Sequence, residues 1–375
     1  MIYFDNAATT FPNPESVYLE LDKANRNAFN TGRGSYKCAR EASILKDLVK
    51  NNLLKLNNIK TGNVIYTSSA TASLNNIIFG LNLKENDYIY VSPFEHNSII
   101  RPLEQLKKIK KINIEVLSFN KESWEPDLNK INDQFAFHKP AAVFLSQVSN
   151  VTGYILPYEQ IFELSNKYNS INVLDAAQGY GIVPITNVSN INYIVFAGHK
   201  SLYASFGIAG FIKIKNDELD TCIFGGTGSD TMNPNMPSSI PDKYEAGSPN
   251  IVSIRGLNAS IDWLNNHEVY KHEYELTKYL LEQLQSLKKI KVFIPDDIKN
   301  IFGIVSIGVD GYSSDDVGNI LDDEFSICVR TGYHCAPLVH DFIDSLVYNG
   351  TVRISLSYFN TKAEIDDLIE ALKTL

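Results

Sequence analysis

Short apolar runs alternate with segments of helical periodicity over the first two thirds of the chain. From about Glu15 to Tyr244 this alternation is the pattern of a doubly wound α/β domain. Several runs lack a period of two, so they predict strands buried on both faces of a mainly parallel sheet, in which a ligand binds beyond the carboxyl ends of the strands. The predicted strands are 63–66, 88–91, 114–117, 142–146, 172–174, 193–196 and 209–214.

The last third of the chain follows a different pattern. A stretch at 224–249 is rich in Gly, Ser, Thr, Pro and Asn, and its length indicates a functional loop. Beyond it we predict a helical region at 253–287, strands at 291–294, 303–309 and 327–329, a helix at 314–322, and a final helix at 362–372 capped by Asn360 or Thr361. We therefore predict a large domain at 15–258 and a small α+β domain made of 1–14 and 259–375.

The composition of the 375 residues is that of an ordinary globular protein, with 44% hydrophobic and 21% charged residues. The longest apolar runs are far shorter than the roughly 20 residues that span a bilayer. The 34 basic and 43 acidic residues give a net charge of −9, which argues against nucleic acid or an anionic membrane as the main partner. The N-terminal residues lack the basic and apolar regions of a secretory signal, so we expect a cytoplasmic protein.

The cysteines indicate a reactive thiol near the C-terminus. Cys38, Cys222, Cys328 and Cys335 form no Cys-x-x-Cys pair and no zinc-like spacing with histidine, so we expect neither a disulfide framework nor a metal site. Cys335 stands beside a histidine in a polar segment with a glycine, five positions after an arginine, and nearby cations favour the thiolate. Cys328 lies in an apolar run and is interpreted as a packing residue.

Two predicted strand ends carry the residues of a Schiff-base site. Asp175 follows one strand and Lys200, 25 positions later, follows the next. A lysine can form a Schiff base and an aspartate can hold a pyridinium proton, which is the pairing that makes pyridoxal phosphate (PLP) an electron sink. Taken alone, the aspartate is more often a helix cap and the lysine a solvated charge. Their combination with the residues below favours the cofactor.

Three further positions fit such a site. The segment 66–75 runs from a strand through small residues into a helix, which offers free backbone N–H groups to a phosphate, although an ordinary capped turn has the same pattern. His96 follows the next strand, where it could lie flat on a pyridine ring, although a lone histidine is more often structural. Arg353 sits in a largely apolar strand and needs an anionic partner, either a substrate carboxylate or a structural salt bridge.

Together these motifs resemble the class V, fold-type I PLP enzymes, and within them the cysteine desulfurases and selenocysteine lyases. The likeness covers nearly the whole chain, from Tyr3-Phe-Asp-Asn-Ala-Ala-Thr-Thr10 to the segment that follows Arg353. The segment 330–336 is similar to the compact cysteine loop of the Suf-type enzymes rather than the longer loop of the Nif/Isc type. The resemblance implies a fold-type I PLP-dependent transferase, with a mainly parallel doubly wound large domain and a small α+β C-terminal domain.

The resemblance also implies roles for individual residues. The residues that would contact the cofactor are Lys200 as the Schiff base, Asp175 at the pyridine nitrogen, Gln178 at the phenolic oxygen, His96 stacked on the ring, Ala70, Thr71 and His199 at the phosphate, and Asn150 facing cofactor and substrate. Arg330 and Arg353 would bind the substrate. Thr227 would reach the phosphate of a neighbouring subunit, so a homodimer is implied.

The function implied is the removal of sulfur from cysteine. The Cys335 thiolate would take the substrate sulfur as a persulfide, leaving alanine, and the sulfur would pass to a protein acceptor. Selenocysteine lyase is the nearest alternative, and a class V aminotransferase, which needs no thiol, is another. A non-catalytic scaffold or sulfur-relay component is a third, and the presence of the lysine, aspartate, histidine, arginine and cysteine together argues against it.

Overall fold

The large sheet follows the strands predicted from the apolar runs. The computed structural model describes residues 1–31 and 34–375, and within them seven strands form this sheet in the order β2-β8-β7-β6-β5-β3-β4. They are β2 (Asn63–Thr67), β3 (Tyr88–Val91), β4 (Asn113–Val116), β5 (Pro140–Ser146), β6 (Ile171–Asp175), β7 (Tyr193–Ala197) and β8 (Ala209–Lys213). In this sheet β8 alone runs opposite to the other six strands, so the prediction of a mainly parallel sheet is confirmed.

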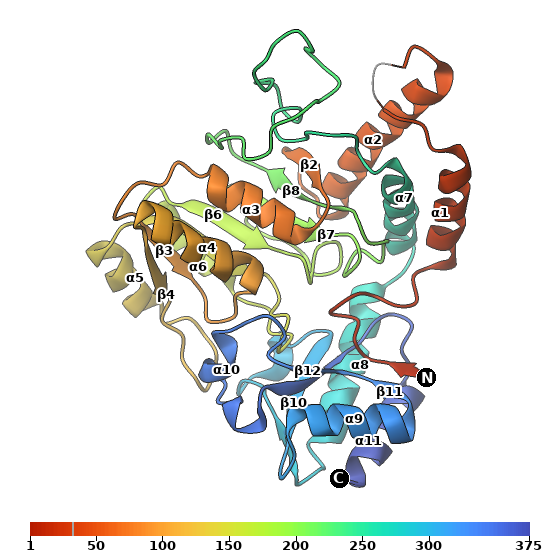
Figure 1. Ribbon diagram of the computed structural model, residues 1–375. Helices are drawn as coiled ribbons and strands as arrows, with labels where there is room; N and C mark the ends of the chain where they lie inside the picture. Colours follow the sequence, from red (N-terminus) through yellow and green to blue (C-terminus); the bar gives the residue numbers. More distant parts are fainter. Residues whose placement is uncertain (32–33) are drawn as a thin grey trace.

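Helices cover both faces of the large sheet, because successive residues of a strand point to opposite sides. Ile65 and Val195 face α3 (Ala70–Gly80) and α4 (Asn97–Lys110). Tyr66 and Ile194, one position away in each strand, belong to the core on the other face. The helices that contribute to that second core are α2 (Lys37–Leu56), α5 (Leu128–Phe137), α6 (Tyr158–Asn166) and α7 (Ile251–Asn265). Outside them, α1 (Glu15–Asn27) packs along α7 (Figure 1).

A smaller antiparallel sheet forms the lower part of the molecule as drawn in Figure 1. Its order is β12 (Arg330–Gly332), β13 (Thr351–Ser355), β10 (Ile304–Val309) and β9 (Ile290–Val292). Its core includes apolar residues of α8 (Val269–Leu284), α9 (Ser314–Phe325) and α11 (Lys362–Lys373), while α10 (Val339–Phe342) is a single turn. The predicted α+β character of this part is confirmed. Short 3₁₀ turns lie at Val188–Asn190, Ile298–Asn300 and Leu346–Tyr348.

Several local predictions differ from the structure. The helical region predicted at 253–287 is two helices, because α7 ends at Asn265 and α8 begins at Val269. The strand predicted at 327–329 is β11 (Ile327–Cys328), which pairs with the N-terminal β1 (Ile2–Tyr3) instead of joining the small sheet. The sequence interpretation also included Arg330–Gly332 in the cysteine loop, whereas these residues form β12. Both β11 and β12 are defined by pairing with residues far away in the chain, and such pairing leaves no local pattern in the sequence.

The structure shows where the last predicted helix begins and what form the predicted loop takes. Thr361 caps the last helix, since its side chain accepts a bond from the backbone N–H of Glu364. The segment 224–249 contains neither helix nor strand, and Figure 1 shows this green segment projecting beyond the large sheet.

The predicted domain boundary between residues 258 and 259 falls inside α7, and the domain limits stay a prediction. Among the described helices, none combines the length and apolarity that crossing a bilayer requires.

Candidate active site

A cavity of about 190 Å³ opens at the carboxyl ends of the parallel strands. Ser146, Asp175 and Ala197, the last residues of β5, β6 and β7, all line it. The doubly wound topology explains this position, since ligands of such sheets bind beyond the strand ends. The predicted cofactor residues that line it are Ala70, Thr71, His96, Asn150, Asp175, Gln178, His199 and Lys200.

Asp175 and Lys200 form the charged pair of the cavity. Burial raises the pKa of the Asp175 carboxyl, opposed by a 3.0 Å bond to its Oδ1 from the backbone N–H of Ala177 and by the Lys200 charge. Burial also lowers the pKa of Lys200 to about 8, opposed by the Asp175 charge. A larger fraction of the amine is therefore uncharged near neutral pH than for an ordinary lysine, which is the state that forms a Schiff base.

His96 presents a neutral imidazole to the same cavity. It caps α4, and its Nδ1 accepts a 3.0 Å bond from the backbone N–H of Ser98. The proton of the neutral ring therefore lies on Nε2. Burial lowers the pKa of His96 to about 3, and the Lys200 charge acts in the same direction. An uncharged ring of this kind can stack on an electron-poor pyridine without adding charge to it.

Another part of the cavity lining is suited to an anion. The α3 helix begins at Ala70, and its cap Ser69 uses its Oγ to accept a 3.1 Å bond from the backbone N–H of Ala72. Helix N-termini favour negative charge. The Nδ1 atom of His199 is buried and has no hydrogen-bond partner among the described residues, and burial lowers the pKa of this histidine to about 4. A bound phosphate would be stabilised by the N-terminus of α3 and would give Nδ1 of His199 a hydrogen-bond partner.

Arg353 is held by groups of the protein itself. It is 2% exposed, and its Nη2 forms a 2.6 Å ion pair with Oδ1 of Asp5. Its Nη1 donates to the carbonyl of Asn150 at 3.0 Å, while its buried Nε has no partner in the described part of the chain. The salt-bridge alternative considered from the sequence is therefore correct for one nitrogen of this guanidinium. The substrate-binding role stays a prediction that concerns the N–H groups that these two bonds leave free.

Arg330 adds a second positive charge next to Arg353. It lies directly opposite Arg353 in the antiparallel β12–β13 pair, so the two side chains leave the same face of the small sheet. Within the described residues Arg330 has no ion pair, and Asp5 is the single carboxylate paired with Arg353. Two guanidinium groups beside one carboxylate leave a positive charge, which suits the carboxylate of an amino-acid substrate.

The cysteine loop is docked at the edge of the cavity. The backbone N–H of Asn97, next to His96, donates to the carbonyl of Cys335 at 2.6 Å. The side-chain amide of Asn150 donates to the carbonyl of His334 at 2.7 Å. The thiol-bearing residue Cys335 is exposed. Asn150 thus lines the cavity, contacts the arginine and holds the loop at the same time.

The N-terminal motif joins the two parts of the site. Thr10 Oγ1 donates to the carbonyl of Lys200 at 2.8 Å, and Gln178 Nε2 donates to the carbonyl of Ala7 at 3.0 Å. Asp5, five residues before Thr10, is the partner of the buried arginine. The segment 4–10 therefore fastens the small sheet to the lysine turn, which explains physically why this stretch of sequence accompanies the site.

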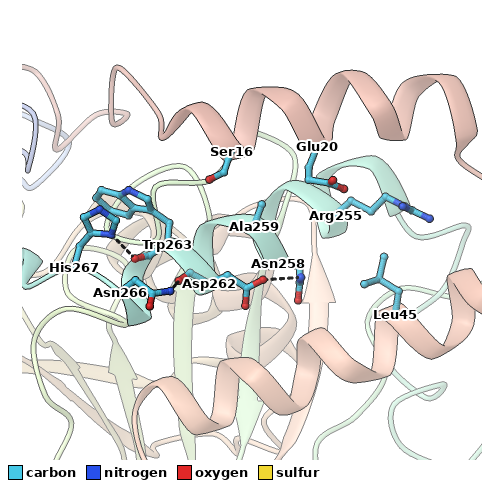
Figure 2. Close-up of a pocket in the computed structure, with 10 residues that line it drawn as sticks. All are labelled: Ser16, Glu20, Leu45, Arg255, Asn258, Ala259, Asp262, Trp263, Asn266 and His267. Carbon is cyan, nitrogen blue, oxygen red and sulfur yellow. Dashed lines mark hydrogen bonds between the residues drawn. The ribbon is translucent and has the colours of Figure 1, made fainter.

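Thr227 is not brought into this cavity. It lines a different cavity, of about 940 Å³, together with Tyr66, Ser68 and Gly247. A third cavity, of about 540 Å³, lies between α1, α2 and α7 (Figure 2). Its polar lining includes Arg255 and Asp262, but none of the predicted site residues contributes to it. Among these three cavities, the lysine and aspartate meet only in the one at the strand ends.

Two acidic residues next to the site are not predicted from the sequence. Asp5 belongs to the N-terminal motif Tyr3–Thr10, but nothing in the sequence pairs it with an arginine 348 positions away. Glu95 is fully buried and bonded to Ser92 and Ser146. The one sequence signal for a role of Glu95 in the site is its position directly before His96. That signal is weak, because a lone glutamate is expected at the surface.

Comparisons with known proteins agree with this geometry. The family model of class-V aminotransferases matches residues 2–368, so the chain belongs to that family, whose enzymes use PLP. The chain is similar to probable cysteine desulfurases of Methanothermobacter thermautotrophicus and Borreliella burgdorferi, each 29% identical over all of this chain and covering 94% and 91% of the relative. A solved apo cysteine desulfurase from Thermococcus onnurineus superposes with a TM-score of 0.88 at 28% identity, covering 100% of this chain and 95% of that one.

A second solved structure supports the fold. A cysteine desulfurase from Escherichia coli in its S-sulfonic acid form gives a TM-score of 0.83 at 24% identity, with 99% of this chain and 94% of that chain covered. The predicted fold-type I α/β architecture is confirmed. The residues of the cavity fit PLP, because a lysine, a carboxylate, a neutral imidazole and an unpaired buried donor surround one space.

Proposed function

We propose that this protein is a cysteine desulfurase that removes sulfur from L-cysteine, releases L-alanine and holds the sulfur as a persulfide on Cys335. The observation that carries the proposal is the docking of an exposed cysteine against the cavity of Lys200 and Asp175, through the bond between Asn97 and the Cys335 carbonyl. An aminotransferase has no use for a thiol at this place. The full-length similarity to probable cysteine desulfurases supports the same function.

The residues that line the cavity act on the α-carbon of the substrate, each in a different role. Bound PLP supplies an electron sink that acidifies the substrate α-proton. Lys200 anchors the cofactor and, as an amine with its pKa lowered to about 8, accepts and returns that proton. Asp175 holds a proton at the pyridine nitrogen by its negative charge. His96 excludes water from one face of the ring and adds no charge.

The small sheet supplies the groups that act on the rest of the substrate. The free donors of Arg353 and Arg330 bind the carboxylate and orient the substrate side chain toward the cysteine loop. The Cys335 thiolate attacks the substrate sulfur, so that an S–S bond forms as the Cβ–S bond breaks. The electron pair of the broken bond enters the carbon skeleton, which takes up a proton and leaves as alanine.

The test is a Cys335→Ala variant. We expect it to keep the absorption band of bound PLP and to form neither alanine nor a persulfide from cysteine, because the thiol acts on sulfur and not on the cofactor. Amino-acid analysis and mass spectrometry of the intact protein measure the two products. A Cys222→Ala variant, which removes a thiol outside the cavity, is the matched control and should behave as the wild type. Normal alanine formation by the Cys335→Ala variant would refute the proposal.

The proposal extends to the partners of the reaction. Cys335 is exposed, so a protein acceptor can reach a persulfide formed on it. A homodimer is supported by Thr227, which lies outside the cavity of its own chain, and by the exposed apolar side chains of Phe224 and Met232 beside it in sequence. The cytoplasmic location, the two-domain limits and the Suf-type assignment of the cysteine loop stay predictions.

A further inference from the structure

Glu95 is a carboxyl group buried beneath the active site. It is 0% exposed and does not line the cavity. Its Oε1 accepts bonds from Ser92 Oγ at 2.6 Å and from the backbone N–H of Ser146 at 2.8 Å, and its Oε2 is bonded to Ser146 Oγ at 2.8 Å. Within the described residues it has no cationic partner. Such a group is costly to bury as an anion, so it needs an explanation.

The neighbours of Glu95 are the supports of two cofactor-binding residues. Ser92 follows β3 and Ser146 ends β5, and these strands are adjacent in the sheet. Ser146 is in register with Asp175 at the end of β6. Glu95 is also the residue directly before His96. The Glu95 side chain therefore ties the end of β3, next to His96, to the end of β5, which lies beside Asp175 at the end of β6.

We propose that Glu95 is a positioning residue of the reaction: its bonds to Ser92 and Ser146 set the place of the His96 ring relative to the Asp175 carboxylate. Glu95 touches neither substrate nor cofactor, and it acts through the residues on either side of the cofactor plane. The inference rests on the proposed function only for its kinetic readout, since the positions of His96 and Asp175 also affect cofactor binding alone.

The protonated form of Glu95 suits this role. Burial raises its pKa to about 8, the hydrogen bonds oppose the shift, and the Asp175 charge adds to it. As a neutral acid, Glu95 donates from Oε2 to Ser146 Oγ and keeps accepting at Oε1. A glutamine can make the same bonds, with Nε2 donating to Ser146 Oγ. The conservative variant Glu95→Gln should therefore preserve the arrangement, while Glu95→Ala removes all three bonds.

The experiment compares Glu95→Gln, Glu95→Ala and Ser92→Ala in the full-length protein. The apoprotein is titrated with PLP, the absorption and visible circular dichroism of the bound cofactor are recorded, and kcat and KM for cysteine are measured. For Glu95→Ala we expect an altered dichroism band and a kcat lowered roughly 30-fold, with KM within about 3-fold, because misplaced groups affect the transition state more than ground-state binding. Glu95→Gln should stay within about 2-fold of the wild-type kcat with an unchanged band.

A matched control separates positioning from general stability. Ser165 is equally buried, and its Oγ bonds to Asn172 near the other end of the same sheet. Ser165→Ala should leave the dichroism band and kcat unchanged, while Ser92→Ala lowers kcat about 5-fold. Wild-type behaviour of Glu95→Ala, equal damage in Glu95→Gln, or equal damage in the two serine variants would overturn the proposal. If Glu95→Ala fails to fold, the two serine variants decide.

The outcome is distinct from a failure of the proposed function. If the wild-type protein forms no alanine from cysteine, the desulfurase proposal fails, whatever the Glu95 variants do. The cofactor titration and the dichroism band then still test Glu95, because both depend on PLP binding and not on sulfur chemistry.

Discussion

The site has two parts that are held in place in different ways. The cofactor floor, which consists of Ala70, Thr71, His96, Asp175 and Lys200, stands at the ends of the large sheet. The small-sheet wall, which consists of Arg330, Arg353 and Cys335, comes from the last fifty residues of the chain. The floor residues line the cavity at the strand ends, whereas the wall residues are the ones proposed to bind and attack the substrate.

The contacts of the two parts differ in range. On the floor, Asp175 is bonded to the backbone two residues later, and His96 likewise to Ser98. On the wall, Arg353 is paired with Asp5 across 348 positions. The Asn150 side chain reaches the cysteine loop across 184 positions. These floor contacts lie within local turns at the ends of the large sheet, whereas the wall contacts depend on how the N-terminal segment and the small sheet dock. A substitution in the floor or in the wall should therefore leave the properties of the other part measurable.

The largest effect should come from the floor. A Lys200→Ala variant removes the amine that anchors the cofactor and carries the α-proton, so we expect kcat to fall by at least about 10⁴-fold. Mass spectrometry after borohydride reduction should find no cofactor attached to the protein. A Lys213→Met variant, which removes another buried lysine, should keep the attached cofactor. Attachment at a different lysine in Lys200→Ala would break the assignment of the floor.

The next effect concerns the wall. An Asp5→Asn variant leaves the buried Arg353 guanidinium without its ion-pair partner, and we expect the free energy of unfolding to fall by about 3 kcal/mol. This is the lower end for a buried pair, because the Asp5 side chain is 21% exposed. Urea unfolding measures the loss, and the cofactor band should persist. The exposed pair of Asp22 and Arg26 is the control, since Asp22→Asn should cost no more than about 0.5 kcal/mol. Equal losses would contradict the distinction between the two pairs.

The smallest effect is a pH dependence of cofactor attachment. Burial lowers the pKa of Lys200 to about 8, so the free amine increases as the pH rises through that value. Below pH 8 the rate at which the apoprotein forms its Schiff base with PLP should rise about 10-fold per pH unit, and above pH 9 it should level off. Stopped-flow absorbance measures this rate. A rate that keeps rising beyond pH 10 would show an amine with an ordinary pKa.

The chain order of strands and polar residues was enough to predict that the floor residues converge at one edge of the large sheet. Parallel strands present their carboxyl ends at one edge, so residues that follow different strands converge without any knowledge of the packing. His96, Asp175 and Lys200 each follow a predicted strand, and all three line one cavity. The mainly parallel sheet and the α+β character of the second part were predicted for the same reason, because the period of apolar residues is a local property.

Tertiary structure alone decided the wall and the supports of the floor. The pairing of β1 with β11, the separate strand at Arg330, the ion pair of Arg353 with Asp5 and the docking of the cysteine loop on Asn97 join positions far apart in the chain. The sequence determined which side chains with reactive chemistry this protein carries. Which of them face one another depends on long-range hydrogen bonds and on burial, as for Glu95, and these arise only when the two sheets have formed and packed.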